Sequence, residues 1–383
     1  MKSINHSKST VYFKNLDGLR FFAAAFVILG HCQAVLYEGK HIHFYTPFAD
    51  KLSSFGVDFF FVLSGFLISF LLLKELETTG TINIRHFYYR RFLRIWPLYF
   101  GFGIVWILLG TTQSFYFGPW IGYPPTVQTT EVLLGNLAFL ATFSINFQAF
   151  LHLGNPFQAG HFWSLGVEEQ FYLIWAPTLW LFRRHLLAAI LVFVSIGFAL
   201  DLPPKNWFSM FYEFQYNFTA NRFFQFGSGA LLAWLLRSGF LTPQYPSSKW
   251  ASRALQIAVL TPMAMFLFGN HYYPPIHKNY EQIVNGFMSI GIIACAIAEY
   301  SVFPFENTAL KYLGKISFGI YVFHIPAVRF SQKIWIDYAR LPTDSAAYWW
   351  LFPLTAAVIA VVFSTISYEF FEKYFLKLKS HFR

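Results

Sequence analysis

The chain has 383 residues, of which 56% are hydrophobic, 22% are aromatic and only 12% are charged. Soluble globular proteins are about one quarter charged, so this chain has too few charges to cover its surface in water. The formal net charge is +10. No folded polar face gathers the basic residues, however, and we therefore expect no nucleic-acid partner. Composition predicts an all-α, polytopic integral membrane protein.

Ten apolar stretches are candidates for membrane-spanning helices, which need roughly 20 apolar residues to cross a ~30 Å hydrocarbon core. The predicted spans are 17–36, 54–73, 97–116, 162–182, 186–200, 222–236, 254–268, 283–303, 316–336 and 347–371. A further apolar stretch, 131–150, is ambiguous. We therefore predict one membrane domain over residues 1–383 with about ten transmembrane helices and no appended soluble domain.

The distribution of lysine and arginine predicts the orientation of these spans. With both the N-terminus and the C-terminus in the cytoplasm, the inside segments carry most of the basic residues, as the positive-inside rule requires. The outside loops carry only Lys40, Lys51, Lys205, Lys278 and Arg340. A full span at 131–150 would move every later loop to the other side, so this stretch is predicted to be re-entrant or to lie on the outer face. We expect a multi-pass protein of the inner (cytoplasmic) cell membrane, in contact with membrane lipids.

The two cysteines, Cys32 and Cys295, both lie inside predicted spans. This arrangement excludes a disulfide framework and a CxxC metal pair, and we expect neither a metal nor a permanently bound cofactor. The first span carries no evident cleavage signal and is predicted to be retained as an anchor.

The first span carries Arg20 and His31, eleven residues or about three helical turns apart, so both side chains share one face. Asp17 lies on the same stripe. The helical rise places His31 about 16 Å further outward than Arg20. Each residue alone has an ordinary explanation, Arg20 as a positive-inside anchor and His31 as a hydrogen-bonded core histidine. Their shared face favours a functional pair in which His31 is a general base.

The second span carries Asp58 near its outer end and Ser64-Gly65 near mid-membrane. Asp58 could pair with a histidine at the same depth. For Ser64-Gly65 we favour close packing between helices, which is the commoner use of small residues in membranes.

The fourth span carries two adjacent glutamates, Glu168 and Glu169, which cannot both be cheaply ionised in lipid. Glu168 shares a stripe with Ser164 and Tyr172, whereas Glu169 points about 100° away. A buried carboxylate beside an imidazole can orient the ring and raise its basicity. Simple pairing between helices would use the same residues.

A basic cluster of Arg90, Arg91 and Arg94 lies among aromatic residues just inside the membrane. One interpretation is an interfacial segment that binds anionic lipid. The other is a phosphate clamp, because a guanidinium matches phosphate oxygens with two parallel hydrogen bonds. The ninth span adds His324 at mid-membrane, a candidate for substrate contact or for hydrogen bonding in the core.

These positions form two layers, basic residues at the cytoplasmic mouth and His31, Asp58, Glu168 and Glu169 toward the outer face. A phosphate-bearing donor could bind inside while a proton acceptor works near the outside. Such an arrangement suits the movement of an acyl group across the membrane onto an external hydroxyl.

Five segments resemble, in matching order across nearly the whole chain, the acyltransferase 3 family: LDGLRFFAAAFVILGHC, GVDFFFVLSGFLI, RRFLRIWPLYF, FWSLGVEEQFYLIW and ISFGIYVFH. The resemblance implies a ten-helix membrane domain, acyl-coenzyme A as the donor, and O-acylation of cell-surface or secreted carbohydrate. Many relatives carry an additional SGNH-type esterase domain outside the membrane. The family's motifs fall on Arg20 and His31, on Arg91 and Arg94, and on Ser164, Leu165 and Glu168.

We therefore predict a membrane-bound O-acyltransferase, with acetyl-coenzyme A as donor and a carbohydrate or glycolipid as acceptor. Arg20, Arg90, Arg91 and Arg94 are predicted to hold the coenzyme A phosphates. His31 is the predicted general base, supported by Glu168 and Asp58, and the predicted substrate contacts are Ser164, Glu169, Tyr172 and His324. One alternative is an acyltransferase for a lipid or a small-molecule sugar. Another is a secondary transporter or flippase, which would show repeated halves with interrupted helices; no repeat is visible.

Overall fold

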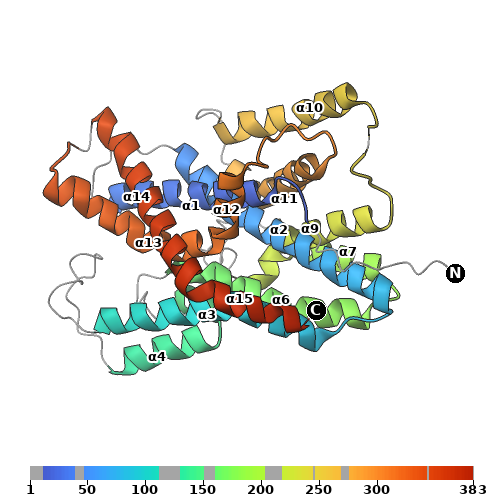
Figure 1. Cartoon of the computed structure of the whole chain (residues 1–383), viewed down its shortest axis with the longest axis horizontal. Coiled ribbons are helices and arrows are strands. Elements are labelled where there is room, and N and C mark those ends of the chain that lie inside the picture. Colours follow the sequence, from blue (N-terminus) through green and yellow to red (C-terminus); the bar gives the residue numbers. More distant parts are fainter. Residues whose placement is uncertain are drawn as a thin grey trace.

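The computed structural model describes residues 12–38, 47–111, 130–150, 160–202, 218–244, 246–268, 276–342 and 345–382. Within these ranges the regular structure is entirely helical and contains no strand, which confirms the all-α prediction (Figure 1). Residues 112–116 of the third predicted span, and Lys40 and Lys205 of the outside loops, lie outside the described residues.

Each of the ten predicted spans falls on a helix of the structure. The helices are α1 (Leu16–Glu38), α2 (Pro47–Thr79), α3 (Ile84–Thr111), α4 (Thr130–Ala141), α5 (Ile145–Phe150), α6 (Trp163–Leu181), α7 (Leu186–Asp201), α9 (Phe223–Arg237), α10 (Lys249–Phe268), α11 (Ile276–Ile297), α12 (Thr308–Lys315), α13 (Ser317–Gln332), α14 (Ala346–Ser367) and α15 (Lys373–Leu378). Short 3₁₀ helices, Gly160–Phe162 and Thr219–Arg222, precede α6 and α9, and π-helical turns, Lys333–Tyr338 and Tyr368–Glu372, follow α13 and α14.

Five helical segments among the described residues are long and apolar enough to cross a membrane. They are Leu16–Val35, Phe48–Thr79, Lys249–Leu267, Tyr280–Ile297 and Ala347–Leu378. The apolar side chains of such helices favour lipid over water. A helix can enter lipid because its backbone groups are hydrogen-bonded within the helix. The chain is therefore a multi-pass helical membrane protein, while the full count of ten spans and the cytoplasmic position of both termini stay predictions.

The ambiguous stretch 131–150 forms two helices, α4 of 12 residues and α5 of 6 residues, instead of one long helix. The break lies at Phe143, whose φ of 52° is rare for a residue with a side chain. The Phe143 carbonyl accepts a hydrogen bond of 2.8 Å from the amide of Gln170 on α6. Neither helix reaches the roughly 20 residues of a full span, and the position of the stretch relative to the membrane stays a prediction.

Close contact between α2 and α9 depends on glycine. A Cβ atom on Gly65 would overlap the backbone carbonyl of Phe226, and one on Gly229 would overlap the carbonyl of Val62. The two helices therefore approach until their backbones touch, as small residues allow in membrane proteins. The packing interpretation of Gly65 is confirmed.

Asp58 belongs to a buried polar network between α2, α9 and α11. One carboxylate oxygen forms an ion pair of 3.0 Å with Arg222, and the side chains are 2% and 1% exposed. The other oxygen accepts a hydrogen bond of 2.9 Å from the Asn285 amide. The Arg222 guanidinium also lies over the Trp163 ring, 5.4 Å from its centroid. These contacts give Asp58 a framework role, and its predicted role as a support of His31 stays a prediction.

Replacing Asp58 by alanine should destabilise the fold by about 3–5 kcal/mol, because the buried Arg222 charge would lose its anion. Thermal unfolding of the purified protein in detergent measures the loss. The double variant Asp58→Ala, Arg222→Met should recover part of it, since neither charge of the pair is then left without the other. A single variant that melts at the wild-type temperature would contradict the framework role.

Candidate active site

A cavity of about 330 Å³ lies between α1, α2, α3, α6 and α13. The residues of α2 that line it extend from Val57 to Leu71, a distance of about 20 Å along the helix. Arg20, near the start of α1, and Lys379, near the C-terminus, also line it. Figure 1 shows why the C-terminal residues are near: α15 lies alongside α3. The cavity is thus elongated and joins groups that are far apart in the sequence.

The cationic end of the cavity contains Arg20, Arg91 and Arg94. Arg20 is paired with Asp17 at 2.9 Å. The Arg91 guanidinium lies over the Tyr172 ring, 5.5 Å from its centroid, and its Nε atom has no hydrogen-bond partner. In the described ranges neither Arg91 nor Arg94 forms an ion pair with an acidic side chain. Guanidinium groups without such partners are suited to an anion with several oxygens, such as phosphate.

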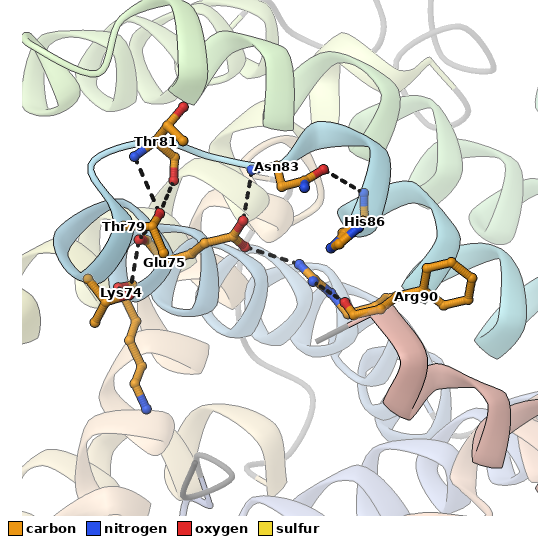
Figure 2. Close-up of polar contacts among 9 residues, drawn as sticks. Lys74, Glu75, Thr79, Thr81, Asn83, His86 and Arg90 are labelled. Atoms are coloured by element: carbon orange, nitrogen blue, oxygen red, sulfur yellow. Dashed lines mark hydrogen bonds and ion pairs between the residues drawn. The ribbon is translucent and has the colours of Figure 1, made fainter. Parts of the chain in front are cut away.

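Arg90, the remaining arginine of the predicted clamp, points to other partners (Figure 2). Its guanidinium forms an ion pair of 3.2 Å with Glu75 and donates a hydrogen bond of 2.9 Å to the Phe382 carbonyl. Glu75 also accepts a hydrogen bond of 2.7 Å from the backbone of Asn83, in the α2–α3 connection. Arg90 does not line the cavity. It secures the α2–α3 connection and the C-terminal segment, so we leave it out of the candidate phosphate site.

The two glutamates of α6 have different partners, as their angular separation predicts. The Glu168 carboxylate accepts hydrogen bonds from the Ser64 and Tyr172 hydroxyls, and all three residues line the cavity. Glu169 accepts a hydrogen bond of 3.2 Å from the Trp96 indole and does not line the cavity. Glu168 is therefore the glutamate that belongs to the site, and Glu169 is a contact between α6 and α3.

Ser164 and Tyr321 meet at the far end of the cavity from the arginines. Their hydroxyl oxygens are 2.5 Å apart, and both residues line the cavity. Each hydroxyl oxygen also lies within hydrogen-bonding distance of the His161 carbonyl, at 3.1 Å from Ser164 and 3.0 Å from Tyr321. Each hydroxyl has one hydrogen, so at most two of these three contacts are hydrogen bonds at one time. Within the described part of the chain the Glu168 side chain accepts hydrogen bonds from Ser64 and Tyr172, and none from His31.

Three histidines from three separate elements gather beyond the Ser164–Tyr321 pair. The His31 and His324 ring centroids are 4.7 Å apart, and those of His161 and His324 are 4.8 Å apart. The sequence singled out His31 and His324 but missed His161. A signal was present, because His161 lies three residues before Ser164 and seven before Glu168, on the same helical stripe. None of the three lines the cavity.

Comparison with known proteins identifies relatives over nearly the whole chain. The model of the acyltransferase 3 family, described as an acyltransferase domain, matches residues 13–369. Peptidoglycan O-acetyltransferase OatA of Listeria monocytogenes is 28% identical over 340 residues, which cover 85% of this chain and 51% of OatA. A Bacillus subtilis protein named "Putative peptidoglycan O-acetyltransferase YrhL" is 25% identical, over 94% of this chain and 54% of its own length.

The chain thus spans a little over half the length of these curated relatives. No solved structure matches it.

Proposed function

The chain belongs to the acyltransferase 3 family and is an acyltransferase, and from this premise we propose that it moves an acetyl group from cytoplasmic acetyl-coenzyme A to a hydroxyl of a cell-surface carbohydrate. The printed names of OatA, "Peptidoglycan O-acetyltransferase", and of YrhL, "Putative peptidoglycan O-acetyltransferase", support a carbohydrate acceptor. Family membership disfavours the alternative of a secondary transporter or flippase. The observation that carries the proposal is the elongated cavity, with cations at one end and the histidines just beyond the other.

In this proposal Arg20, Arg91 and Arg94 bind the phosphates of the donor. Arg91 and Arg94 are half-buried and form no ion pair with an acidic side chain in the described ranges, and phosphate oxygens would offset their loss of hydration. Arg20 and His31 are about 16 Å apart along α1, a distance comparable to an extended pantetheine arm. Phosphates held by the arginines would therefore leave the thioester near the histidines.

His31 is the proposed general base. Its Nδ1 atom is 3.0 Å from the Val27 carbonyl, which can only accept, so Nδ1 carries the hydrogen. In the neutral ring Nε2 then holds the lone pair that can take a proton. As the acceptor oxygen bonds to the thioester carbon, His31 takes the hydroxyl proton, the carbon–sulfur bond breaks, and the coenzyme A thiolate finally receives a proton.

Glu168 has a different role here from direct support of His31. Together with Ser64 and Tyr172 it lines the path between the phosphate end and the thioester end. We propose that Glu168 fixes the hydroxyls of Ser64 and Tyr172, while Ser164 and Tyr321 contact the thioester end of the donor.

A sided transfer assay tests this function. Purified protein is reconstituted into vesicles with radiolabelled acetyl-coenzyme A on one face and soluble peptidoglycan glycan strands on the other. We expect base-labile acetyl groups on the glycan and free coenzyme A on the donor face. Coenzyme A release without acetylated glycan would point to the lipid or small-molecule acceptor. If no coenzyme A is released when glycan, lipid and small-molecule sugar acceptors are each supplied in turn, acetyl-coenzyme A is not the donor.

A further inference from the structure

The three clustered histidines each direct one ring nitrogen at a backbone carbonyl. The pairs are His31 Nδ1 with the Val27 carbonyl at 3.0 Å, His161 Nε2 with the Val322 carbonyl at 3.1 Å, and His324 Nδ1 with the Tyr321 carbonyl at 2.5 Å. A carbonyl oxygen only accepts hydrogen bonds, so the facing nitrogen must be the protonated one. The backbone therefore selects the tautomer of every ring in the cluster.

The opposite nitrogens consequently carry lone pairs when the rings are neutral. These are Nε2 in His31 and His324 and Nδ1 in His161. His161 Nδ1 and His324 Nε2 are buried and have no hydrogen-bond partner within the described part of the chain. A buried polar atom without a partner is unfavourable and calls for an explanation, such as a catalytic role. Here the free atoms are both proton acceptors.

The surroundings restrict what these acceptors can receive. His324 is 0% exposed and His161 is 5% exposed, whereas His31 is partly exposed, so of the three rings only His31 is placed to meet a substrate. The described residues also contain no group of three or more histidine, cysteine, aspartate or glutamate side chains that could hold a metal ion. A proton needs no added volume. His324 lies between the other two rings, so a proton that reaches His31 has a neighbouring acceptor.

Building on the proposed acetyl transfer, we propose that His324 and His161 are positioning residues that share the proton taken up by His31. The acceptor oxygen bonds to the thioester carbon, and its proton passes to His31 Nε2. The positive charge is then distributed toward His324 Nε2 and His161 Nδ1, instead of remaining on a single imidazolium in a low-dielectric site, where a lone charge is costly. The proton leaves the cluster to neutralise the departing thiolate, so no net proton is gained or lost.

Two amide substitutions isolate the basic nitrogens from the structural hydrogen bonds. In His161→Gln the amide nitrogen replaces Nε2 and can still donate to the Val322 carbonyl. In His324→Asn the amide nitrogen replaces Nδ1 and can still donate to the Tyr321 carbonyl. Each variant thus preserves the carbonyl contact and removes only the proton acceptor. The control is His185→Gln, at an exposed position just before α7 and outside the cluster.

We expect His161→Gln and His324→Asn to lower kcat by about 10- to 100-fold, at or below the roughly 100-fold lower limit of what direct proton transfer by a side chain contributes, because both rings act through His31. The KM for acetyl-coenzyme A and the melting temperature should not change, and His185→Gln should match the wild type. The double variant should lose little more than His324→Asn alone, because His161 acts through His324 and such effects are not additive. If one variant does not fold, the kcat of the other variant tests proton sharing by itself, because each single variant is expected to show the decrease in kcat.

Wild-type turnover in the same assay reports on acetyl transfer itself, separately from the histidine variants. Normal kcat in both single variants beside an active wild type would overturn proton sharing and leave the proposed function intact. A double variant whose loss equals the product of the single losses would also overturn it, because the two rings would then act independently.

Discussion

His31→Ala is expected to lower kcat for acetyl transfer by about 10²- to 10⁴-fold, the usual contribution of a general base. The variant removes the lone pair that takes the acceptor proton, while the arginines remain about 16 Å away along α1. The KM for acetyl-coenzyme A should therefore change little. The measurement is steady-state transfer by protein purified to equal abundance and equal melting temperature.

His31→Asn refines this test. Its amide nitrogen can retain the hydrogen bond that His31 makes to the Val27 carbonyl, but it offers no basic nitrogen. We expect it to be as inactive as His31→Ala. Wild-type activity in either variant would rule out His31 as the base. Activity in His31→Asn combined with poor folding of His31→Ala would instead support the interpretation of His31 as a hydrogen-bonded core histidine.

Arg91→Ala and Arg94→Ala are each expected to weaken donor binding by about ten- to a hundredfold. A lost hydrogen bond to a charged group costs roughly 1.5–3 kcal/mol, which corresponds to this range of affinity. The KM for acetyl-coenzyme A should rise, with smaller effects on kcat and on the acceptor. Arg→Lys at either position should recover only part of the loss, because an ammonium lacks the planar fork that matches two phosphate oxygens.

The matched control for these variants is Arg183→Ala. Arg183 is exposed after α6 and donates a hydrogen bond to the Trp180 carbonyl. It should leave the affinity for acetyl-coenzyme A unchanged, as measured by titration of the purified protein in detergent. If the Arg91 and Arg94 variants bind the donor normally and differ only in lipid association, the arginines are contacts for anionic lipid. The donor site would then have to be sought elsewhere.

The class of structure and several of the shared helix faces could be predicted from the sequence alone. Low charge content and long apolar stretches require helices in lipid, since no other solvent would accept them. Because helical periodicity is a local property, the shared faces of Arg20 with His31, and of Ser164 with Glu168 and Tyr172, could also be predicted. The order of the five motifs indicated the family, and the family match agrees with it.

The contacts between side chains on different helices could not be predicted from the sequence and become visible in the folded structure. Ser64 and Glu168 are 104 positions apart in the chain, and Asp58 and Arg222 are 164 apart. Sequence reasoning treated Asp58 as a neighbour of His31 because both were predicted at one depth, but depth does not specify which helix a side chain faces. Arg90 was grouped with Arg91 for the analogous reason, although adjacent residues on a helix point about 100° apart.

His161 shows the same limit most clearly. It lies on the same stripe as Ser164 and Glu168, a local pattern. Its proposed role depends on residues far away in the chain. The Val322 carbonyl, 161 positions away, faces its Nε2 atom, and its ring lies against His324, which in turn lies against His31. Periodicity along one helix predicts which side chains share a face. Only the packing of separate helices determines what that face meets, because those contacts depend on the shapes of residues far apart in the chain.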